Sequence, residues 1–219
     1  MDDLRIPKNW TFANVEVAKH FDAHVREQLP WYDLVTFATV HIARHYVHDG
    51  GRIYDIGAST GNIGRALAET IRDRALEYVA IEKAEEMRVC FQAPGELLIA
   101  DATKVEYKTF DVAICFLVLM FLPFGDRCKF ILHLLEKCRP GGAVIVVDKV
   151  EPSSGFASTV LSRLAIGAKL LAGISSEAIL KKELSLSGSQ RPLSLVEIPE
   201  GSIEFFRFGD FVGFYYERR

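Results

Sequence analysis

Residues 54–64 read YDIGASTGNIG, an apolar run with an acid in it, followed by glycines at positions 57, 61 and 64. The residues RIYDI at 52–56 favour a buried strand, and the residues that follow from 62 to 76 favour a helix. Glycine tolerates positive φ and carries no Cβ, so such a turn lets the backbone approach a ligand closely. The stretch therefore predicts a binding site at the first strand-to-helix turn.

Strand and helix patterns alternate on either side of this turn. Strand-like runs follow at 77–82, 96–100, 110–119 and 143–150, and helical patterns lie between them at 83–91 and 126–138. Alternation of this kind predicts an α/β fold with a doubly wound, mainly parallel sheet of seven strands, of the Rossmann-like type. Two β-type runs around Gly209-Asp210 predict a hairpin that closes the sheet.

We expect a single domain in four parts. The helical patterns at 12–29 and 31–47 predict an N-terminal helical cap over residues 1–48. The alternating region forms a core at 50–152. A helical insertion, with helices at about 156–184, occupies 153–195, and the closing β-hairpin spans 196–219.

Composition excludes several classes of protein. The 219 residues carry a net charge of −3, so no strong overall field attracts nucleic acid or an anionic membrane. The longest apolar run, at 112–124, is too short to span a bilayer, and the N-terminus MDDLRIPKNW lacks the apolar region of a signal peptide. The four cysteines form no CxxC pair, which indicates reduced thiols and a cytoplasmic location.

Two of the three ligand classes fit the glycine turn poorly. A dinucleotide site requires G-x-G-x-x-G, and here Ser59 occupies the middle glycine position. The letters GASTG also match the G-x-S-x-G elbow of serine hydrolases. The only histidine after Ser59 is His133, however, and it lies in a helical pattern rather than in a loop at the strand ends.

The third class is suggested by a resemblance. YDIGASTG resembles motif I of class I S-adenosylmethionine-dependent methyltransferases. Three further stretches follow in register: AIEKAEEM with Glu82, IADATKVEY with Asp101, and FDVAICFLVLMFL followed by KCRPGGAVIVVDKVEP. The four motifs cover roughly residues 50–152. The resemblance implies a methyltransferase fold and S-adenosyl-L-methionine as the cofactor.

Within this class, FLVLMFL and KCRPGG are similar to the tellurite-resistance methyltransferases. FDAHVREQLPWYD, Ser59 in place of the usual glycine, and RPGGAVIVVDK are similar to the carboxy-S-adenosylmethionine synthases of tRNA wobble-uridine modification. Those synthases often carry a Lys-Arg pair where this chain has Lys182-Glu183. The missing arginine favours methyl transfer, and carboxyl transfer is the alternative.

The resemblance implies a role for each candidate cofactor-binding residue. The turn at Gly57, Ala58, Ser59 and Gly61 leaves room for the methionine part, with Asp55 near its ammonium group. Glu82 accepts from the ribose hydroxyls, since a carboxylate is a pure acceptor. Asp101 accepts from the adenine amine, and the Ala102 N–H lies near N1. The remaining residues are Lys83 along the same path, Phe116 beside the methyl group and Tyr32 covering the site.

The methyl acceptor is not specified by the sequence. No catalytic base is assigned. The D/N-P-P-Y motif of DNA amino methylation is absent, so we expect a small-molecule or RNA acceptor and no DNA, and a homodimer or a non-catalytic cofactor-binding protein remain open. His41, His45 and His48 share a helix face, but no further ligand completes a metal site. The basic residues at the end of the insertion, Lys169, Lys181, Lys182 and Arg191, are expected at the surface.

Overall fold

The structure is a computed structural model that describes residues 10–151 and 154–219. The N-terminal nonapeptide, on which the expectation of no signal peptide partly rests, lies outside the described residues. None of the helices within the described ranges is long and apolar enough to cross a membrane.

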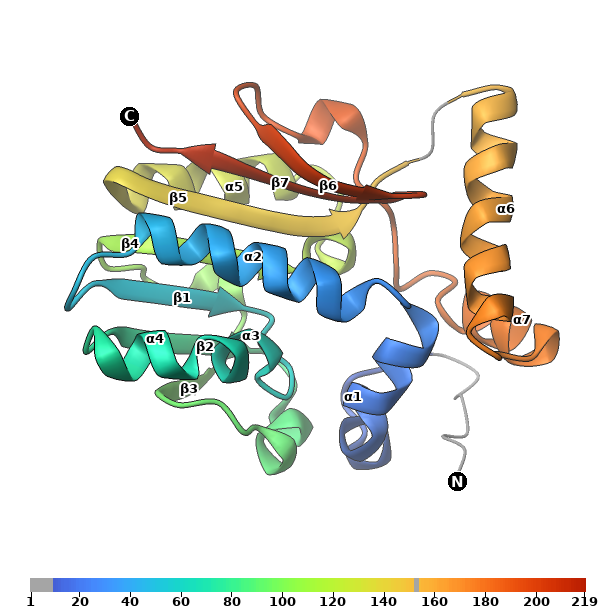
Figure 1. Cartoon of the computed structure of the whole chain (residues 1–219), viewed down its shortest axis with the longest axis horizontal. Helices are drawn as coiled ribbons and strands as arrows, with labels where there is room; N and C mark the ends of the chain where they lie inside the picture. The colour runs from blue at the N-terminus through green and yellow to red at the C-terminus, as the bar shows by residue number, and fades with distance from the viewer. Residues whose placement is uncertain (1–9, 152–153) are drawn as a thin grey trace.

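The centre of the fold is a seven-stranded sheet in the order β3-β2-β1-β4-β5-β7-β6 (Figure 1). Its first five strands in the chain pair in parallel, and β7 pairs antiparallel with both β5 and β6. The strands are β1 (Arg52–Ile56), β2 (Glu77–Glu82), β3 (Glu96–Ile99), β4 (Phe110–Phe116), β5 (Cys138–Lys149), β6 (Ile203–Phe208) and β7 (Phe211–Glu217). The predicted doubly wound sheet and its closing hairpin are confirmed.

The strand order places the glycine turn where ligands bind in such sheets. Chain order reverses between β1 and β4, which are neighbours in the sheet, and the turn follows β1 directly. In open α/β sheets, ligands bind beyond the carboxyl ends of the strands at this reversal point.

Helices cover both faces of the sheet (Figure 1). They are α1 (Val15–Gln28), α2 (Tyr32–Tyr46), α3 (Asn62–Ala66), α4 (Ala68–Asp73), α5 (Arg127–Lys137), α6 (Phe156–Leu171) and α7 (Ser176–Ser185), with 3-10 turns η1 (Glu85–Cys90), η2 (Ala102–Lys104), η3 (Leu119–Phe121) and η4 (Leu195–Glu197). One core cluster holds Val35 and Val40 of α2, and the other holds Ile131 and Leu134 of α5. The sheet is therefore buried on both faces, as its continuous apolar strands require.

Three predicted elements differ in detail. The helix expected over 62–76 is interrupted at Leu67, and the one expected over 83–91 is a 3-10 helix. β5 begins at Cys138, five residues before the strand expected over 143–150, and so includes the PGG residues at 140–142. A Cβ on Gly142 would stand 2.3 Å from the carbonyl oxygen of Asp111, so the glycine lets β5 lie close beside β4 before the apolar run begins.

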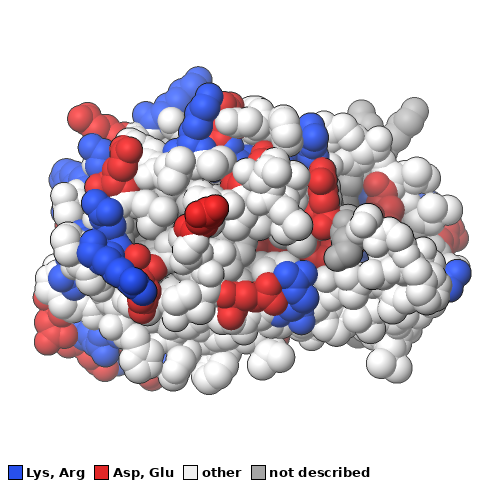
Figure 2. Space-filling model, turned by 90° about the horizontal axis from the view of Figure 1, so that it is seen from above, with Lys and Arg blue, Asp and Glu red and all other residues white. Residues whose placement is uncertain are grey.

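The long helix α6 stands at one end of the molecule (Figure 1) and contains no buried residue. Its exposed apolar side chains include Phe156, which is 76% exposed, and Leu171, which is 91% exposed. Figure 2 shows acidic and basic side chains interspersed on most of the face in view and a largely uncharged region at the end where α6 lies.

A buried ion pair ties α5 to the segment that follows the insertion. Arg127 and Glu197 are 1% and 5% exposed, and the Arg127 Nη1–Glu197 Oε2 distance is 3.3 Å. Arg127 also donates to the carbonyl oxygens of Leu122 at 3.0 Å and Pro192 at 3.1 Å. The guanidinium therefore joins the β4–α5 loop to the chain after α7.

Replacing Arg127 by methionine leaves the Glu197 carboxylate buried without its cation, so Arg127→Met should lower the free energy of unfolding by about 3–5 kcal/mol. Urea denaturation measures the change. Lys181→Met is the matched control, because Lys181 pairs with Glu177 at the surface and should lose less than about 1 kcal/mol. The double variant Arg127→Met/Glu197→Leu should recover part of the loss. Equal unfolding free energies for Arg127→Met and the control would contradict this assignment.

Candidate functional site

The backbone of the glycine turn is held against β2. The N–H groups of Gly57 and Ala58 both donate to the Ile81 carbonyl oxygen, at 2.8 and 3.0 Å. Gly57 and Gly61 have φ of +71° and +88°, and Ser59, at +51°, is also in the left-handed region that L-residues with side chains seldom adopt. The turn after β1 thus lies at the carboxyl end of the strand, and three of its residues have φ in the left-handed region.

Glu82, the last residue of β2, fastens this turn with its carboxylate. Its Oε2 accepts from the Ser59 N–H at 2.9 Å, and its Oε1 accepts from the N–H groups of Lys83 at 2.8 Å and Ala84 at 2.9 Å. The side chain is 8% exposed. An ionised carboxylate has about four acceptor positions, so three backbone donors leave capacity for one more donor.

Asp55 lies deeper in the sheet, below the turn. It is 1% exposed, and its carboxylate accepts a hydrogen bond from the Tyr78 hydroxyl. Burial raises the pKa of Asp55 to about 7, against the smaller opposing effect of the Tyr78 hydrogen bond. A cation bound near the Asp55 carboxyl group would therefore favour its ionised form.

Asp101 and Lys83 meet at the ends of β3 and β2. Lys83 Nζ lies 3.0 Å from Asp101 Oδ2, and Asp101 Oδ1 accepts from the N–H and hydroxyl of Thr103. These hydrogen bonds, with that of Lys83, lower the pKa of Asp101 to about 2. Ala102 follows directly and begins η2. One Asp101 oxygen is thus engaged by Thr103 and the other by a mobile, largely exposed lysine side chain.

Phe116 and Tyr32 are brought together from distant parts of the sequence. Their rings lie 5.4 Å apart at 89°, an edge-to-face arrangement. Phe116 ends β4, and Tyr32 begins α2. The Arg26 guanidinium lies 5.2 Å from the centre of the Tyr32 ring. The first helices therefore cover the end of the sheet beside β4.

The helix α1 is also fastened to the glycine turn. Asp22 accepts from the Thr60 hydroxyl and forms an ion pair with Arg65 of α3. Arg65 in turn donates to the Thr60 carbonyl oxygen. The N-terminal helices are thus positioned to close over whatever the turn binds.

The sequence did not identify three side chains that contact the turn. Met87 of η1 is fully buried, and its Sδ lies 3.7 Å from Ser59 Oγ. Tyr78 pairs with Asp55, and Val118 lies against Gly57. An apolar residue five positions after the strand-end acid, and an aromatic residue in a buried strand, are signals too common to single out from one sequence.

Asp148, at the end of β5, was also missed, although it repeats the pattern of Glu82. It is fully buried and accepts from the N–H groups of Leu119 at 2.7 Å and Lys149 at 2.8 Å. Burial raises its pKa to about 7, partly offset by these hydrogen bonds. Leu117, just before η3, has φ of +59°. The loop after β4 is thus held in a constrained conformation beside Phe116.

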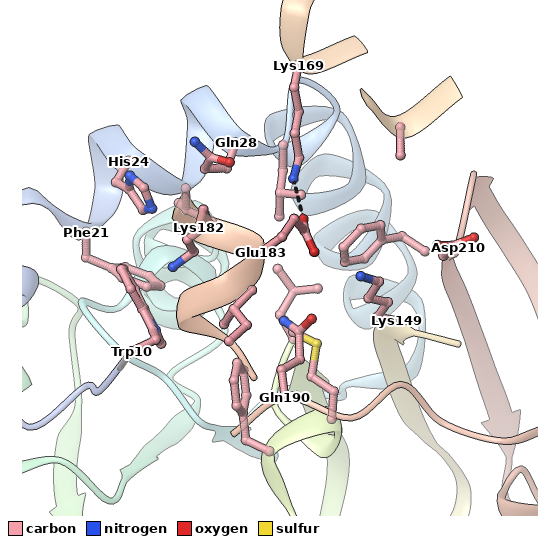
Figure 3. A pocket seen from close by; sticks show the side chains of 18 of the residues that line it. Trp10, Phe21, His24, Gln28, Lys149, Lys169, Lys182, Glu183, Gln190 and Asp210 are labelled. Atoms are coloured by element: carbon pink, nitrogen blue, oxygen red, sulfur yellow. Dashed lines mark hydrogen bonds and ion pairs between the residues drawn. The ribbon is translucent and has the colours of Figure 1, made fainter. Parts of the chain in front are cut away.

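A pocket lies beside this loop, between α1, α6 and α7 (Figure 3). Leu117 and Met120 of the loop after β4 line it, together with Lys149 at the end of β5 and aromatic side chains such as Trp10 and Phe121.

The expectation that all four basic residues of the insertion lie at the surface is wrong for Lys182. Lys182 is 8% exposed and lines the pocket with Lys169, which pairs with Glu183 at 2.9 Å. Lys181 is exposed, and the Arg191 guanidinium lies 3.9 Å from the centre of the Phe124 ring. The helix α7 turns Lys182 inward because it follows the buried Ile179 by three positions.

The hydrolase and metal interpretations gain no support from the geometry. Ser59 Oγ donates to a methionine sulfur rather than to a histidine. His41 and His45 approach to 3.3 Å between their Nε2 atoms, but His48 pairs with Asp111. Within residues 10–151 and 154–219, no group of three or more His, Cys, Asp or Glu side chains is arranged to hold a metal ion.

Gly57→Ala tests the packing of the turn. A Cβ there would stand 2.6 Å from Val118 Cγ2 and would hold φ at +71°, so we expect a loss of about 2 kcal/mol or more in unfolding free energy, from overpacking and backbone strain. Val118→Ala should cost less in the Gly57→Ala background than in the wild type, a favourable coupling in a double-mutant cycle measured by denaturation. Strictly additive effects would show that Val118 is not the obstacle.

Ionisation of Asp55 should make stability depend on pH. Its pKa is raised from 3.8 to about 7 on folding, so the folded state binds more protons and loses stability as pH rises from about 4 to about 7. Asp55→Asn should remove this term. The unfolding free energy of the variant relative to the wild type should therefore rise by up to about 1.4 kcal/mol per pH unit over that range. A difference independent of pH would contradict the assignment.

The sequence of the chain is similar to those of known methyltransferase domains. A family profile described as "Methyltransferase domain" matches residues 54–146. The chain is 26% identical over 194 residues to the carboxy-S-adenosyl-L-methionine synthase of Staphylococcus epidermidis, covering 86% of this chain and 85% of that protein. It is also 26% identical over 188 residues to the synthase of the same name from Shewanella loihica, covering 82% and 77%.

Solved structures share the fold. The plantazolicin methyltransferase BpumL in complex with SAH matches with a TM-score of 0.62 and 13% identity, over 93% of this chain and 90% of that one. Human N-acetylserotonin methyltransferase in complex with SAM matches with a TM-score of 0.57 and 10% identity, over 93% and 55%. Residues 54–146 thus match a methyltransferase domain, and the chain shares the fold of methyltransferases solved with SAM or SAH.

Proposed function

We propose that the chain transfers the methyl group of S-adenosylmethionine to a small acceptor molecule bound in the pocket between α1, α6 and α7. The observation that carries the proposal is the Glu82 carboxylate, which holds the glycine turn and keeps one acceptor position free at the strand-reversal point. A ribose hydroxyl is a donor that suits this position.

The other residues supply the remaining contacts of a cofactor of this shape. The left-handed turn at Gly57 and Gly61 passes beside the methionine part, and Asp55, whose pKa is raised by burial, favours a nearby ammonium group. Asp101 accepts from the adenine amine in place of Lys83, with the N–H of Ala102 beside the ring. The Ala58 and Ser59 backbone completes the turn.

The cofactor supplies an activated methyl group on a cationic sulfur. The task of the protein is to hold the acceptor in line with the bond that breaks, which lowers the barrier by several kcal/mol. Phe116 and Tyr32 form an apolar wall at the end of β4, beside the constrained loop that lines the pocket. This wall excludes water from the space between the cofactor and the acceptor.

The surface charges favour a small acceptor over RNA. Of the four basic residues of the insertion, Lys169 and Lys181 are paired with carboxylates, Lys182 is buried, and Arg191 stacks on Phe124. These residues therefore form no free basic patch, which an RNA backbone would need.

Carboxyl transfer is the second candidate, because two relatives that are aligned over more than three quarters of their length carry the name carboxy-S-adenosyl-L-methionine synthase. No arginine lines the pocket within the described residues. Methyl transfer therefore ranks first. Association of two copies through the exposed apolar side chains of α6 is compatible with either activity.

Glu82→Ala should weaken binding of S-adenosylhomocysteine about ten- to a hundredfold, since a hydrogen bond to a charged group contributes roughly 1.5–3 kcal/mol. Calorimetry measures the dissociation constant. Glu85→Ala, at a side chain 65% exposed, is the matched control and should bind as the wild type does. Wild-type affinity in a folded Glu82→Ala variant would show that Glu82 makes no contact with the ribose.

Mass spectrometry of the purified protein, and of its reaction with S-adenosylmethionine, separates the two candidates. Release of S-adenosylhomocysteine in the presence of an acceptor supports methyl transfer. A copurified ligand heavier than S-adenosylmethionine by one carboxyl group supports the second candidate and rejects the first.

A further inference from the structure

Three buried polar side chains in the pocket lack the partners that burial normally demands. His24 and Gln28 of α1 are each 7% exposed, and His24 Nε2 and Gln28 Oε1 make no hydrogen bond to any described residue. Lys182 is 8% exposed, and its ammonium group makes neither a hydrogen bond nor an ion pair with the residues that the structure describes. Burial of a polar group without a partner is unfavourable.

These three groups point into one apolar pocket. Figure 3 shows Lys182 reaching from α7 toward His24 and Trp10, with Gln28 one turn further along α1. The Lys182 ammonium lies over the Trp10 ring, and the His24 ring stacks on Trp10 with 5.3 Å between ring centres. The side chains of Lys182 and His24 and the amide of Gln28 therefore converge at one end of a cavity whose other walls include aromatic rings.

Lys182 forms no ion pair with a carboxylate among the described residues of the pocket. Lys169 of α6 is paired with Glu183 at 2.9 Å (Figure 3). Lys149 of β5 and Asp210 face the opposite end of the pocket, beside Phe211. A carboxylate bound near Lys182 would therefore meet a basic group that has no ion-pair partner among the described residues.

We propose that this pocket binds an aryl monocarboxylate, with its carboxylate against Lys182 and His24 and its ring among the aromatic side chains. This inference rests on the proposed function, which makes the pocket the acceptor site, but the binding itself requires no cofactor. His24 donates a hydrogen bond to the carboxylate through Nε2–H. Rotation of the Gln28 side-chain amide by 180° places its NH₂ group, instead of its oxygen, toward the ligand. A second negative charge is disfavoured, because it would meet Glu183 or Asp210.

Proton uptake should accompany binding. Burial, with repulsion from Lys169, lowers the pKa of Lys182 to about 6, and burial with repulsion from Lys182 lowers that of His24 to about 4. Both groups are therefore mainly uncharged at pH 7.5 in the free protein. A carboxylate beside Lys182 raises its pKa again, so the lysine takes up a proton from the buffer. The pocket is also lined by the charged residues Lys149, Glu183 and Asp210.

The test is calorimetric titration of the full-length protein with 3-phenylpropionate at pH 7.5, in two buffers of different ionisation enthalpy. We expect saturable binding with uptake that approaches one proton per ligand. The neutral analogue 3-phenylpropanol and the bare anion acetate should each bind at least tenfold more weakly. No binding of 3-phenylpropionate, or equal binding of the alcohol, overturns the inference.

Lys182→Met keeps the apolar stem and removes the ammonium group. It should weaken 3-phenylpropionate binding at least tenfold and abolish the proton uptake, with circular dichroism as the check on folding. Lys181→Met, one residue earlier and exposed, should change neither. Wild-type affinity and proton uptake in Lys182→Met would overturn the inference.

S-adenosylhomocysteine is titrated into the same wild-type preparation. Its binding without 3-phenylpropionate binding rejects this inference and leaves the proposed function in place. Absence of S-adenosylhomocysteine binding rejects the proposed function.

Discussion

The structure of the site depends on one carboxylate at the end of β2. Glu82 joins the backbone of the glycine turn to the start of the next connection through three N–H donors. Ser59 keeps a positive φ within this arrangement, although it carries a side chain. Left-handed backbone of this kind costs of the order of 1 kcal/mol or more and persists where its surroundings fix it. The same carboxylate that fixes the turn remains able to accept from a ligand.

Asp148 holds the backbone on the proposed acceptor side as Glu82 does on the proposed cofactor side. It is buried at the end of β5 and holds the backbone of the loop after β4, which lines the pocket. Arg127 holds the same loop from the other direction. Both halves of the proposed site are thus held by strand-end acids that accept from backbone N–H groups. Ligands bound there would be fixed relative to the sheet.

Regular parts of the fold could be predicted because their signals are local. Strand β2 has the predicted bounds, and the Gly209-Asp210 hairpin was recognised from its turn residues. The inward orientation of Lys182 could not be predicted, because it depends on how α7 packs against α1 across 150 residues of chain. Leu117 at positive φ is a further example, since no local signal in an apolar run indicates it. The roles given to the cofactor-binding residues remain predictions.

The central claim is that the turn after β1 and the Glu82 carboxylate together form the cofactor site. A crystal structure of the protein with S-adenosylhomocysteine tests it most directly. The account predicts a ribose hydroxyl within hydrogen-bonding distance of Glu82 and the amino acid part of the ligand beside Gly57. A ligand bound elsewhere, with Glu82 engaged only by the three backbone N–H groups, would contradict it.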